Sequence, residues 1–360
     1  MRLLFLGEID RGQTSFMRMR AFERLGYIVY GVNTMEPWKR ASWLSRQVQR
    51  RLQFGSVVDE INRSVLTAAR AYRPTLVWAE KQEFLRVETL EGLRKLGARL
   101  IHFTPDPYFT VNWKRTRLMD AAMKAFDVLV YCKSYEKADY EAAAQHLVYM
   151  PLGYCDEVHR PLNSDDPRWL CALGFLGGWD PRREEFLVPL AQTGLGLKIW
   201  GGYWKFLEDG RWTVRRHIIM RQLAGKQEYR IHRNSNLAAC LQGGEVYDDD
   251  YARALTGAKI GIGFLRTTWP DQHTTRTFEI PACGSMLLAD RTAEHQEFFK
   301  EGEEAEFFSS GEELLDKARF YCDHEPSRKR IAVTGFKRCL INKYAYVHRL
   351  KAALNEIQRC

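Results

Sequence analysis

The chain has 360 residues and a formal net charge of +9, and 45% of its residues are hydrophobic against 28% charged. That length predicts two domains of ordinary size, and the composition excludes disordered and fibrous proteins. No apolar run approaches the roughly 18 residues of a membrane-spanning helix, and residues 2–6 are too short an apolar run for a secretory signal. Eight irregularly spaced cysteines favour reduced thiols, so we expect a cytoplasmic protein.

Basic charge is concentrated in the first half of the chain. Residues 1–155 contain 24 Lys and Arg and 16 Asp and Glu, which gives +8, whereas the remainder contains 30 and 29, which gives +1. A basic half indicates an anionic partner, such as phosphate groups, nucleic acid or an acidic membrane surface. No zinc-finger spacing, RNP-like motif or helix-turn-helix signature occurs there, so we expect no nucleic acid partner.

Short apolar runs in the first half alternate with helical stretches. Residues 2–6 form the first run, and a glycine-containing turn and a helical pattern over 16–25 follow it. Further strand-like runs occupy residues 27–32, 75–78, 100–103, 128–131 and 147–150. Short apolar strands that alternate with helices predict a parallel, doubly wound α/β sheet.

A second series of the same kind follows residues 151–161, which proline and glycine mark as a hinge. Its strand-like runs are 172–176, 197–200, 259–262 and 286–288, and helices are expected over 311–322 and 325–357. We therefore predict two doubly wound, Rossmann-like domains that face each other across a cleft, residues 1–155 and 156–340. A C-terminal helix within 341–360 would cross back to the first domain. Ligands of such sheets bind beyond the carboxyl ends of the strands, which makes the cleft the expected active site.

The segment from Gly7 to Thr14 has the glycine spacing of a phosphate-binding P-loop. Gln13 stands where that motif requires a lysine to reach the β- and γ-phosphates, so we reject a P-loop ATPase. Two interpretations stay open. Backbone N–H groups around Gly12 face a diphosphate at the start of the next helix, or the segment is a plain tight turn.

Two further segments are rich in basic residues. Residues 36–54 hold five basic residues and one acidic residue, and Leu44, Val48 and Leu52 recur at helical spacing. Such a helix lies on anionic lipid, or it docks its apolar stripe on its own domain, and we prefer the second interpretation. Residues 211–233 form either a solvated insertion or a surface that faces an anionic ligand.

The acidic residues 248–250 precede a helical pattern. Because acidic side chains are favoured in the first turn of a helix, we prefer that role over a metal site and expect no metal ligands.

Residues 271–288 carry the strongest chemical signal in the chain. A helix that begins near residue 274 would offer N–H donors to a diphosphate, which Arg276 would neutralise. Glu279 could accept both hydroxyls of a ribose, and Gly284 would let the chain turn into the next strand. From the residues alone, an ordinary helix with a surface acidic side chain is the preferred interpretation.

Several stretches occur in the order seen in a known family. They include Ala258–Ile262, the run from Arg276 to Ser285, Phe298–Glu304, and two stretches nearer the start of the domain, 174–178 and 199–204. On these residues, the second half resembles the C-terminal domain of the spore-maturation CgeB-like glycosyltransferases, within the group-one GT-B superfamily. Residues 5–7 and 104–107 extend the resemblance more loosely into the first half.

The resemblance implies a GT-B fold and a nucleotide-sugar donor that the C-terminal domain holds. Glu279 matches the glutamate expected to bind the donor ribose. Asp271 stands where retaining relatives carry the first glutamate of an E-x7-E pair, so its shorter carboxylate departs from the pattern. The resemblance also implies sugar and phosphate contacts from Gln272, Thr274 and Thr275, diphosphate cations at Arg183 and Arg276, and a base neighbour at Val246.

The implied activity is a metal-independent hexosyltransferase reaction, with retention, in bacterial glycan or glycoconjugate biosynthesis. It needs no cofactor besides the nucleotide-sugar co-substrate. If a protein base exists, Asp106 is the candidate, although an equally supported role is that of a turn residue. His273 is a weaker candidate, and His102 is interpreted as a core histidine.

The acceptor would be a glycan, a lipid-linked molecule or a small molecule. A lipid-phosphate-linked acceptor, with the protein peripheral at the inner membrane face, would explain the basic first half. Two alternatives stay open, namely a nucleotide-sugar epimerase of the same fold and a non-catalytic scaffold that binds sugar nucleotides.

Overall fold

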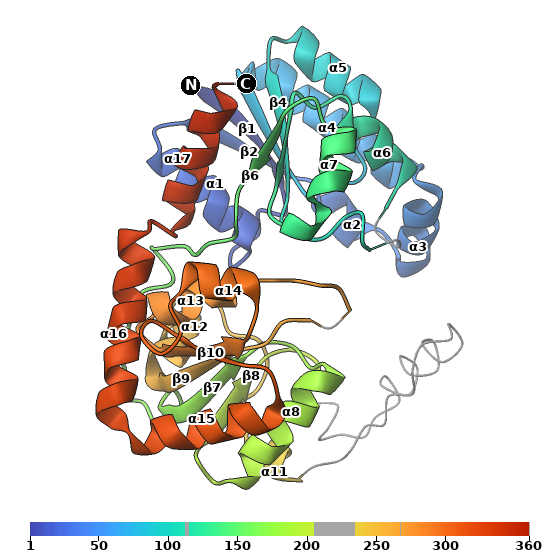
Figure 1. The fold of residues 1–360 in the computed structure, drawn as a ribbon. Helices are drawn as coiled ribbons and strands as arrows, with labels where there is room; N and C mark the ends of the chain where they lie inside the picture. Colours follow the sequence, from blue (N-terminus) through green and yellow to red (C-terminus); the bar gives the residue numbers. More distant parts are fainter. Residues whose placement is uncertain (112–114, 205–234, 267, 360) are drawn as a thin grey trace. The chain divides into compact units, whose positions relative to one another are not determined.

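A computed structural model describes residues 1–111, 115–204, 235–266 and 268–359. The chain folds into two compact units, each built on one parallel sheet (Figure 1). Unit 1 comprises Met1–Cys155 and Tyr344–Cys360, and unit 2 comprises Asp156–Lys343. The predicted α/β class with two doubly wound sheets is therefore confirmed. The basic stretch 211–233 lies outside the described residues.

Unit 1 contains a six-stranded sheet in the order β2-β1-β3-β4-β5-β6, with every neighbouring pair parallel. Its strands are β1 (Arg2–Gly7), β2 (Ile28–Asn33), β3 (Leu76–Glu80), β4 (Arg99–Thr104), β5 (Val128–Tyr131) and β6 (Leu147–Tyr149). The inner strands are buried on both faces, which is why they appear in the sequence as continuous apolar runs. The chain order reverses between β1 and β3, so the switch point of this sheet lies there.

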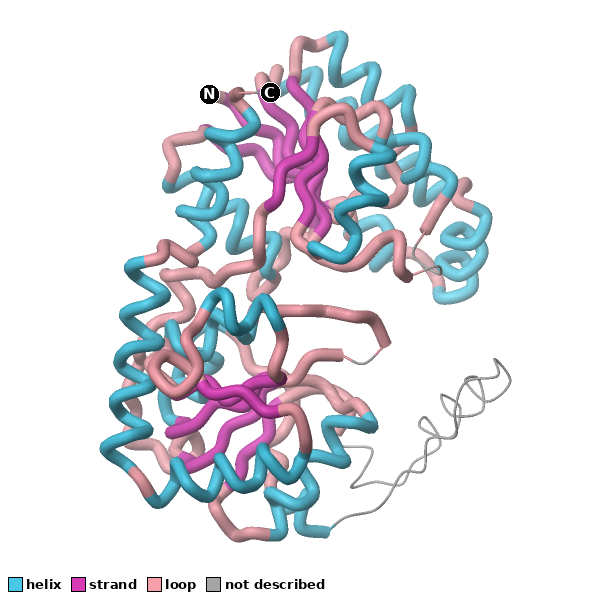
Figure 2. The backbone as a smooth tube through the Cα atoms, in the orientation of Figure 1, coloured by secondary structure: helices cyan, strands magenta, loops and turns pink. Residues whose placement is uncertain are grey.

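The helices of unit 1 cover both faces of that sheet (Figure 2). They are α1 (Thr14–Arg24), α2 (Glu36–Arg40), α3 (Trp43–Leu52), α4 (Ser56–Tyr72), α5 (Val87–Lys95), α6 (Arg117–Met123), the 3-10 turn η1 (Ser134–Glu136), α7 (Lys137–Ala143) and α17 (Tyr346–Ile357). Among the described helices of the chain, none is long and apolar enough to cross a membrane.

Unit 2 contains a five-stranded parallel sheet in the order β11-β10-β9-β7-β8. Its strands are β7 (Cys171–Leu176), β8 (Leu197–Trp200), β9 (Ala258–Gly263), β10 (Met286–Asp290) and β11 (Glu306–Phe308). The described helices are α8 (Pro181–Gln192), α11 (Ser235–Ala239), α12 (Asp248–Gly257), α13 (Arg276–Ala282), α14 (Ala293–Phe298), α15 (Gly311–Asp323) and α16 (Glu325–Ile341). Helices α8, α11 and α15 lie on one face of the sheet, and α12 and α13 lie on the other (Figure 1).

The helical stretch expected over 325–357 consists of two helices. Helix α16 ends at Ile341, Lys343 adopts a left-handed backbone conformation with φ of 58°, and α17 begins at Tyr346. Between them, the backbone N–H of Tyr346 donates to the carbonyl of Tyr154 at 2.7 Å. This segment pairs with backbone that precedes it by almost 200 residues, a tertiary contact that helical periodicity cannot reveal.

Candidate functional site

The switch point of the unit 2 sheet lies between β7 and β9, where the chain order reverses. Parallel sheets of this kind bind ligands beyond the carboxyl ends of their strands at such a point. Strand β7 ends at Leu176 and leads through Gly177 and Gly178 toward α8, while Arg266 follows β9. The side chains that gather here therefore make up the candidate site.

Glu279 on α13 is the buried acidic residue of this site, with only 2% of its surface exposed. The hydroxyl of Tyr251 donates to Oε2 at 2.5 Å, and Nη1 of Arg276 donates to the same oxygen at 2.8 Å. Nε2 of His159 lies 3.7 Å from Oε1. Burial raises the pKa of the carboxyl, but Arg276, His159 and the hydrogen bonds from Tyr251 and Thr275 outweigh it and lower the pKa below 4.5. Glu279 is thus an ionised carboxylate inside the protein.

Arg276 connects this carboxylate to the end of β7. Its Nε donates to the carbonyl of Leu176 at 3.0 Å, and its Nη1 also contacts Oγ1 of Thr275 at 3.2 Å. The guanidinium lies 5.1 Å from the centre of the Tyr251 ring. About a third of the side chain remains exposed, so a ligand can reach the cation.

Arg183 is a second, more deeply buried cation at the start of α8. Its Nη1 donates to the carbonyl of Gly178 at 2.8 Å, but its buried Nε has no hydrogen-bond partner among the described residues. Burial lowers the pKa of Arg183 to about 10, and the neighbouring Arg266 and Arg276 act in the same direction, while Asp180 opposes them. Three guanidinium groups thus share one region, which favours binding of an anion.

Residues 271–275, which precede α13, are held in place by contacts with the interior of unit 2. Asp271 accepts a hydrogen bond from Nε1 of Trp269 at 2.8 Å and is largely buried. The imidazole of His273 is 1% exposed, and its Nδ1 contacts a carboxylate oxygen of Glu294. His273 also packs edge-on against Phe298, with ring centres 5.2 Å apart. The structure therefore places His273 in the interior, where it supports the segment.

The backbone of the same segment is tied to α14 through a relay of hydrogen bonds. The N–H of Thr274 donates to Oγ1 of Thr277 at 3.1 Å, and that hydroxyl lies 2.8 Å from Nε2 of His295. Nδ1 of His295 in turn lies 2.6 Å from the carbonyl of Asp290. Nδ1 must carry a proton to donate to that carbonyl. Because burial lowers the pKa of His295 to about 4, the ring is neutral near pH 7 and Nε2 accepts from the hydroxyl of Thr277.

These contacts distinguish the residues that were predicted to bind the nucleotide-sugar donor. The carbonyl of Gln272 accepts from Oγ1 of Thr292 at 2.6 Å, and the N–H of Thr274 is already bound within the protein. Thr275, in contrast, contacts Arg276. Of these three residues, Thr275 is therefore the one whose side chain contacts the cluster of Arg276 and Glu279.

Val246 is half-buried in the loop before α12, which follows Gly243 with its φ of 104°. The acidic residues 248–250 lie in the first turn of α12, as predicted, and Asp249 and Asp250 pair with Arg160 and Arg253 at 3.1 and 2.9 Å. Within the described part of the chain, no group of three metal-ligating side chains is placed to hold an ion.

Two predicted residues belong to unit 1. Asp106 follows β4, is half-exposed and lies 3.2 Å from Nζ of Lys81. Gly12 adopts a φ of 85° in the turn before α1. The prediction for His102 is confirmed, because its side chain is 1% exposed and its Nε2 accepts from the backbone N–H of Gln82 at 3.2 Å.

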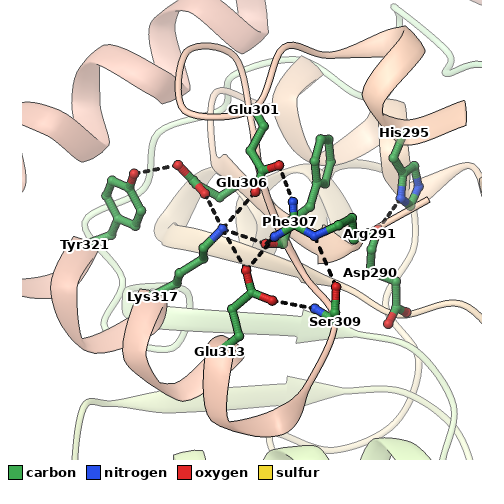
Figure 3. A network of polar contacts seen from close by, with 10 residues as sticks. All are labelled: Asp290, Arg291, His295, Glu301, Glu306, Phe307, Ser309, Glu313, Lys317 and Tyr321. Carbon is green, nitrogen blue, oxygen red and sulfur yellow. Dashed lines mark hydrogen bonds and ion pairs between the residues drawn. The ribbon is translucent and has the colours of Figure 1, made fainter. Parts of the chain in front are cut away.

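A second polar cluster of unit 2 joins β10, β11 and α15 (Figure 3). Nζ of Lys317 lies 2.9 Å from Glu301, 2.7 Å from Glu306 and 3.2 Å from Glu313, and Arg291 also pairs with Glu301 and Glu313. Although burial acts against ionisation, these pairs raise the pKa of Lys317 and lower the pKa of Glu301 and Glu313. Both cations are matched by carboxylates within the protein, so we interpret this cluster as structural.

Three residues of the site were not predicted from the sequence. The sequence does carry a signal for Arg266, because a basic residue that follows an apolar strand at a switch point can meet an anionic ligand. Tyr251 and His159 have none, since only the folded chain places them around Glu279.

Comparison with solved structures decides the fold. Sucrose-phosphate synthase from Thermosynechococcus elongatus aligns with a TM-score of 0.66 at 12% identity, over 99% of both chains. Trehalose 6-phosphate synthase from Burkholderia multivorans aligns with a TM-score of 0.62 at 12% identity, over 99% of this chain and 98% of that one. The chain has the GT-B fold.

HepE from Anabaena, solved in complex with UDP and glucose, aligns with this GT-B chain with a TM-score of 0.61 at 12% identity, over 100% of both chains. Residues 182–355 match the family model described as glycosyl transferase-like, and that range includes Arg183, Tyr251, Arg276 and Glu279. No curated protein matches the chain. The family match and the fold support a glycosyltransferase. The narrower CgeB-like assignment stays a prediction.

Proposed function

We propose that the protein transfers a hexose from a nucleotide-diphosphate sugar to an acceptor hydroxyl, with retention of configuration. One observation carries the proposal. At the switch point of unit 2, an ionised, buried Glu279 lies beside Arg276, and Arg183 and Arg266 add positive charge there. A ribose diphosphate is a ligand whose ribose hydroxyls need a hydrogen-bond acceptor and whose phosphates need several cations a short distance away.

In this proposal Glu279 accepts the ribose hydroxyls, and Tyr251 and His159 keep its carboxylate in place. Arg183, Arg266 and Arg276 neutralise the diphosphate, which becomes a better leaving group as its charge is stabilised. These cations take the part that a metal ion plays in other transferases, so the reaction proceeds without one. The leaving phosphate itself takes the proton of the acceptor hydroxyl, and Asp106 is the alternative base.

The remaining predicted residues have supporting roles in the proposal. Asp271 and Thr275 face the transferred sugar, and Val246 lies beside the base. The acceptor is a glycan, lipid-linked or small-molecule hydroxyl of bacterial glycan synthesis, and unit 1 holds it. We place the reaction in the cytoplasm at the inner membrane face. The spacing of Glu279, Arg276 and Thr275 supports the donor site most directly.

The first experiment measures the thermal shift of the protein with a panel of nucleoside diphosphates and their sugars. A ligand at 100 times its Kd stabilises the folded chain by about 2.7 kcal/mol. We expect one nucleotide family to raise Tm, and Glu279→Gln and Arg276→Gln to abolish the shift. Arg319→Gln is the matched control, because Arg319 is an exposed arginine on α15. A shift that survives in Glu279→Gln would contradict the donor site.

Product analysis then separates the alternative functions. A nucleotide sugar that is stereochemically altered without any acceptor would identify an epimerase. Binding of the donor without turnover, over a broad acceptor panel, would identify a scaffold. An NMR measurement of the anomeric configuration of the product tests retention, and unchanged activity in EDTA tests the metal-independent reaction.

A further inference from the structure

Helix α3 of unit 1 presents its apolar side chains to solvent. The exposed fractions are 57% for Trp43, 65% for Leu44, 45% for Val48, 52% for Leu52 and 60% for Phe54, which follows the helix. No residue of α3 is buried. The preferred expectation, that this apolar stripe docks on its own domain, is therefore wrong.

Polar side chains attach α3 to the rest of unit 1. Oε1 of Gln49 accepts from the backbone N–H of Val57 at 2.8 Å, and its Nε2 donates to Oγ of Ser56 at 3.3 Å. Oε1 of Gln53 accepts from the backbone N–H of Leu118 at 3.1 Å. An ordinary surface helix does the reverse, with its apolar stripe inward and its polar side chains outward. The apolar face of α3 is thus left for a ligand from outside.

The cations around that face differ in whether a nearby carboxylate neutralises their charge. Lys39 and Arg40 are paired with Asp10 and Glu60. Helix α3 itself contains three arginines and no acidic residue. Arg46, Arg50 and Arg51 form no ion pair with a carboxylate of the described residues, although Arg50 also covers the ring of Trp38 at 5.1 Å. Uncompensated positive charge therefore accompanies the exposed apolar stripe.

We propose that α3, with Phe54, is a membrane-docking surface that inserts its apolar side chains into an anionic lipid bilayer. Helices of this composition lie in the interface plane, with apolar side chains below the headgroups and basic side chains at their level. The tryptophan Trp43 suits the same interface. A second protein copy would leave three like charges facing each other, which makes a lipid surface the better occupant. The inference rests on the proposed location at the membrane face and names the element that docks there, and vesicle binding alone tests it.

The experiment is vesicle co-sedimentation of the full chain at low and high salt. Vesicles of phosphatidylcholine alone are compared with vesicles that also contain phosphatidylglycerol. We expect binding to the anionic vesicles that weakens with salt. Replacing Leu44, Val48 and Leu52 by glutamine should lower the partition coefficient at least tenfold. Replacing Arg46, Arg50 and Arg51 by glutamine should lower it on the order of a hundredfold, at about fivefold for each arginine.

Two control variants match these changes elsewhere. Val333, Leu340 and Ile341 are exposed aliphatic residues of α16, and their replacement by glutamine should leave vesicle binding unchanged. Arg63, Arg70 and Arg73 are exposed arginines in and after α4, and glutamine there removes the same net charge. Far-UV circular dichroism confirms that each variant is folded.

Equal vesicle binding by the α3 variants and their controls, or no binding by the wild type, would overturn the proposal. So would a dimer in sedimentation velocity that the Leu44, Val48 and Leu52 variant abolishes, because α3 would then serve self-association. The nucleotide-induced thermal shift is measured on the same proteins. A failure of lipid docking is therefore distinguishable from a failure of the donor site.

Discussion

His102 allows a quantitative prediction about acid stability. Its ring is buried in β4, packs against Phe126 with centres 5.0 Å apart, and accepts a hydrogen bond from Gln82. Burial lowers the pKa of His102 from 6.5 to about 3, although Glu80 acts in the opposite direction. Protonation would also remove the acceptor that Gln82 uses, so the folded state excludes the proton.

The sign of the pH effect follows from the direction of this shift. Because the folded pKa lies below the unfolded one, the unfolded chain binds a proton that the native chain does not. The stability from the neutral ring is complete above about pH 6.5 and is lost as the pH falls toward 3. A pH of 4.5 lies about two units below the pKa of the unfolded histidine. Protonation of the unfolded chain at that pH therefore lowers the free energy of unfolding by about 2.7 kcal/mol.

The variant His102→Gln isolates this contribution, because glutamine keeps an acceptor and does not titrate. We expect the wild type to lose about 2.7 kcal/mol more than the variant between pH 7 and pH 4.5. Other buried histidines, such as His159 and His295, contribute equally to both proteins and cancel. Urea unfolding, monitored by hydrogen exchange of peptides that contain β4, measures the difference in the free energy of unfolding of unit 1 between the two proteins.

The exposed His146 provides the control, and His146→Gln should leave the pH dependence as it is in the wild type. Identical losses in the wild type and in His102→Gln would refute the reasoning. An NMR titration that finds the His102 imidazole protonated near pH 6.5 in the folded protein would refute it independently.

Two further predictions concern packing. Arg18 and Glu80 form a buried ion pair in unit 1, so Arg18→Met should lower the free energy of unfolding by about 3–5 kcal/mol, and adding Glu80→Gln should recover part of that loss. Full stability of Arg18→Met in urea unfolding would contradict this. In α16, a Cβ on Gly335 would lie 2.3 Å from the carbonyl oxygen of Glu304, so Gly335→Ala should cost about 1–3 kcal/mol, whereas Gly244→Ala, which meets open space, should be neutral. Equal melting temperatures of these two variants would count against the close packing of α16.

The sequence predicted the sheets well because buried parallel strands leave a local signal. The runs at 128–131 and 197–200 coincide with β5 and β8. Strand β11 was not predicted, because its three residues begin with the buried Glu306 and so leave no apolar run of strand length. Helical periodicity over 325–357 does not show the break between α16 and α17, where the backbone of Tyr346 pairs with that of Tyr154. Local patterns predict elements, and distant contacts decide where some of them end.

The candidate site was predicted in part for the same reason. Arg276 and Glu279 lie three residues apart on one helix, so their pairing follows from helical geometry. Tyr251 and His159 reach Glu279 from other segments, and no spacing in the sequence announces them. For α3, the sequence showed the apolar stripe and the arginines. It could not show that Gln49 and Gln53 would attach the helix by its polar side.

The two polar clusters of unit 2 indicate how a binding site differs from a structural network. In the cluster of Figure 3, Lys317 and Arg291 meet three carboxylates, and the ion pairs raise the pKa of the two cations and lower the pKa of Glu301 and Glu313. At the switch point, burial and two neighbouring arginines instead lower the pKa of Arg183, and its Nε has no partner among the described residues. A cation that the folded protein leaves uncompensated is stabilised only when an anion arrives. That excess of positive charge, which the first cluster lacks, is the physical reason to place the diphosphate beside Arg183 and Arg276.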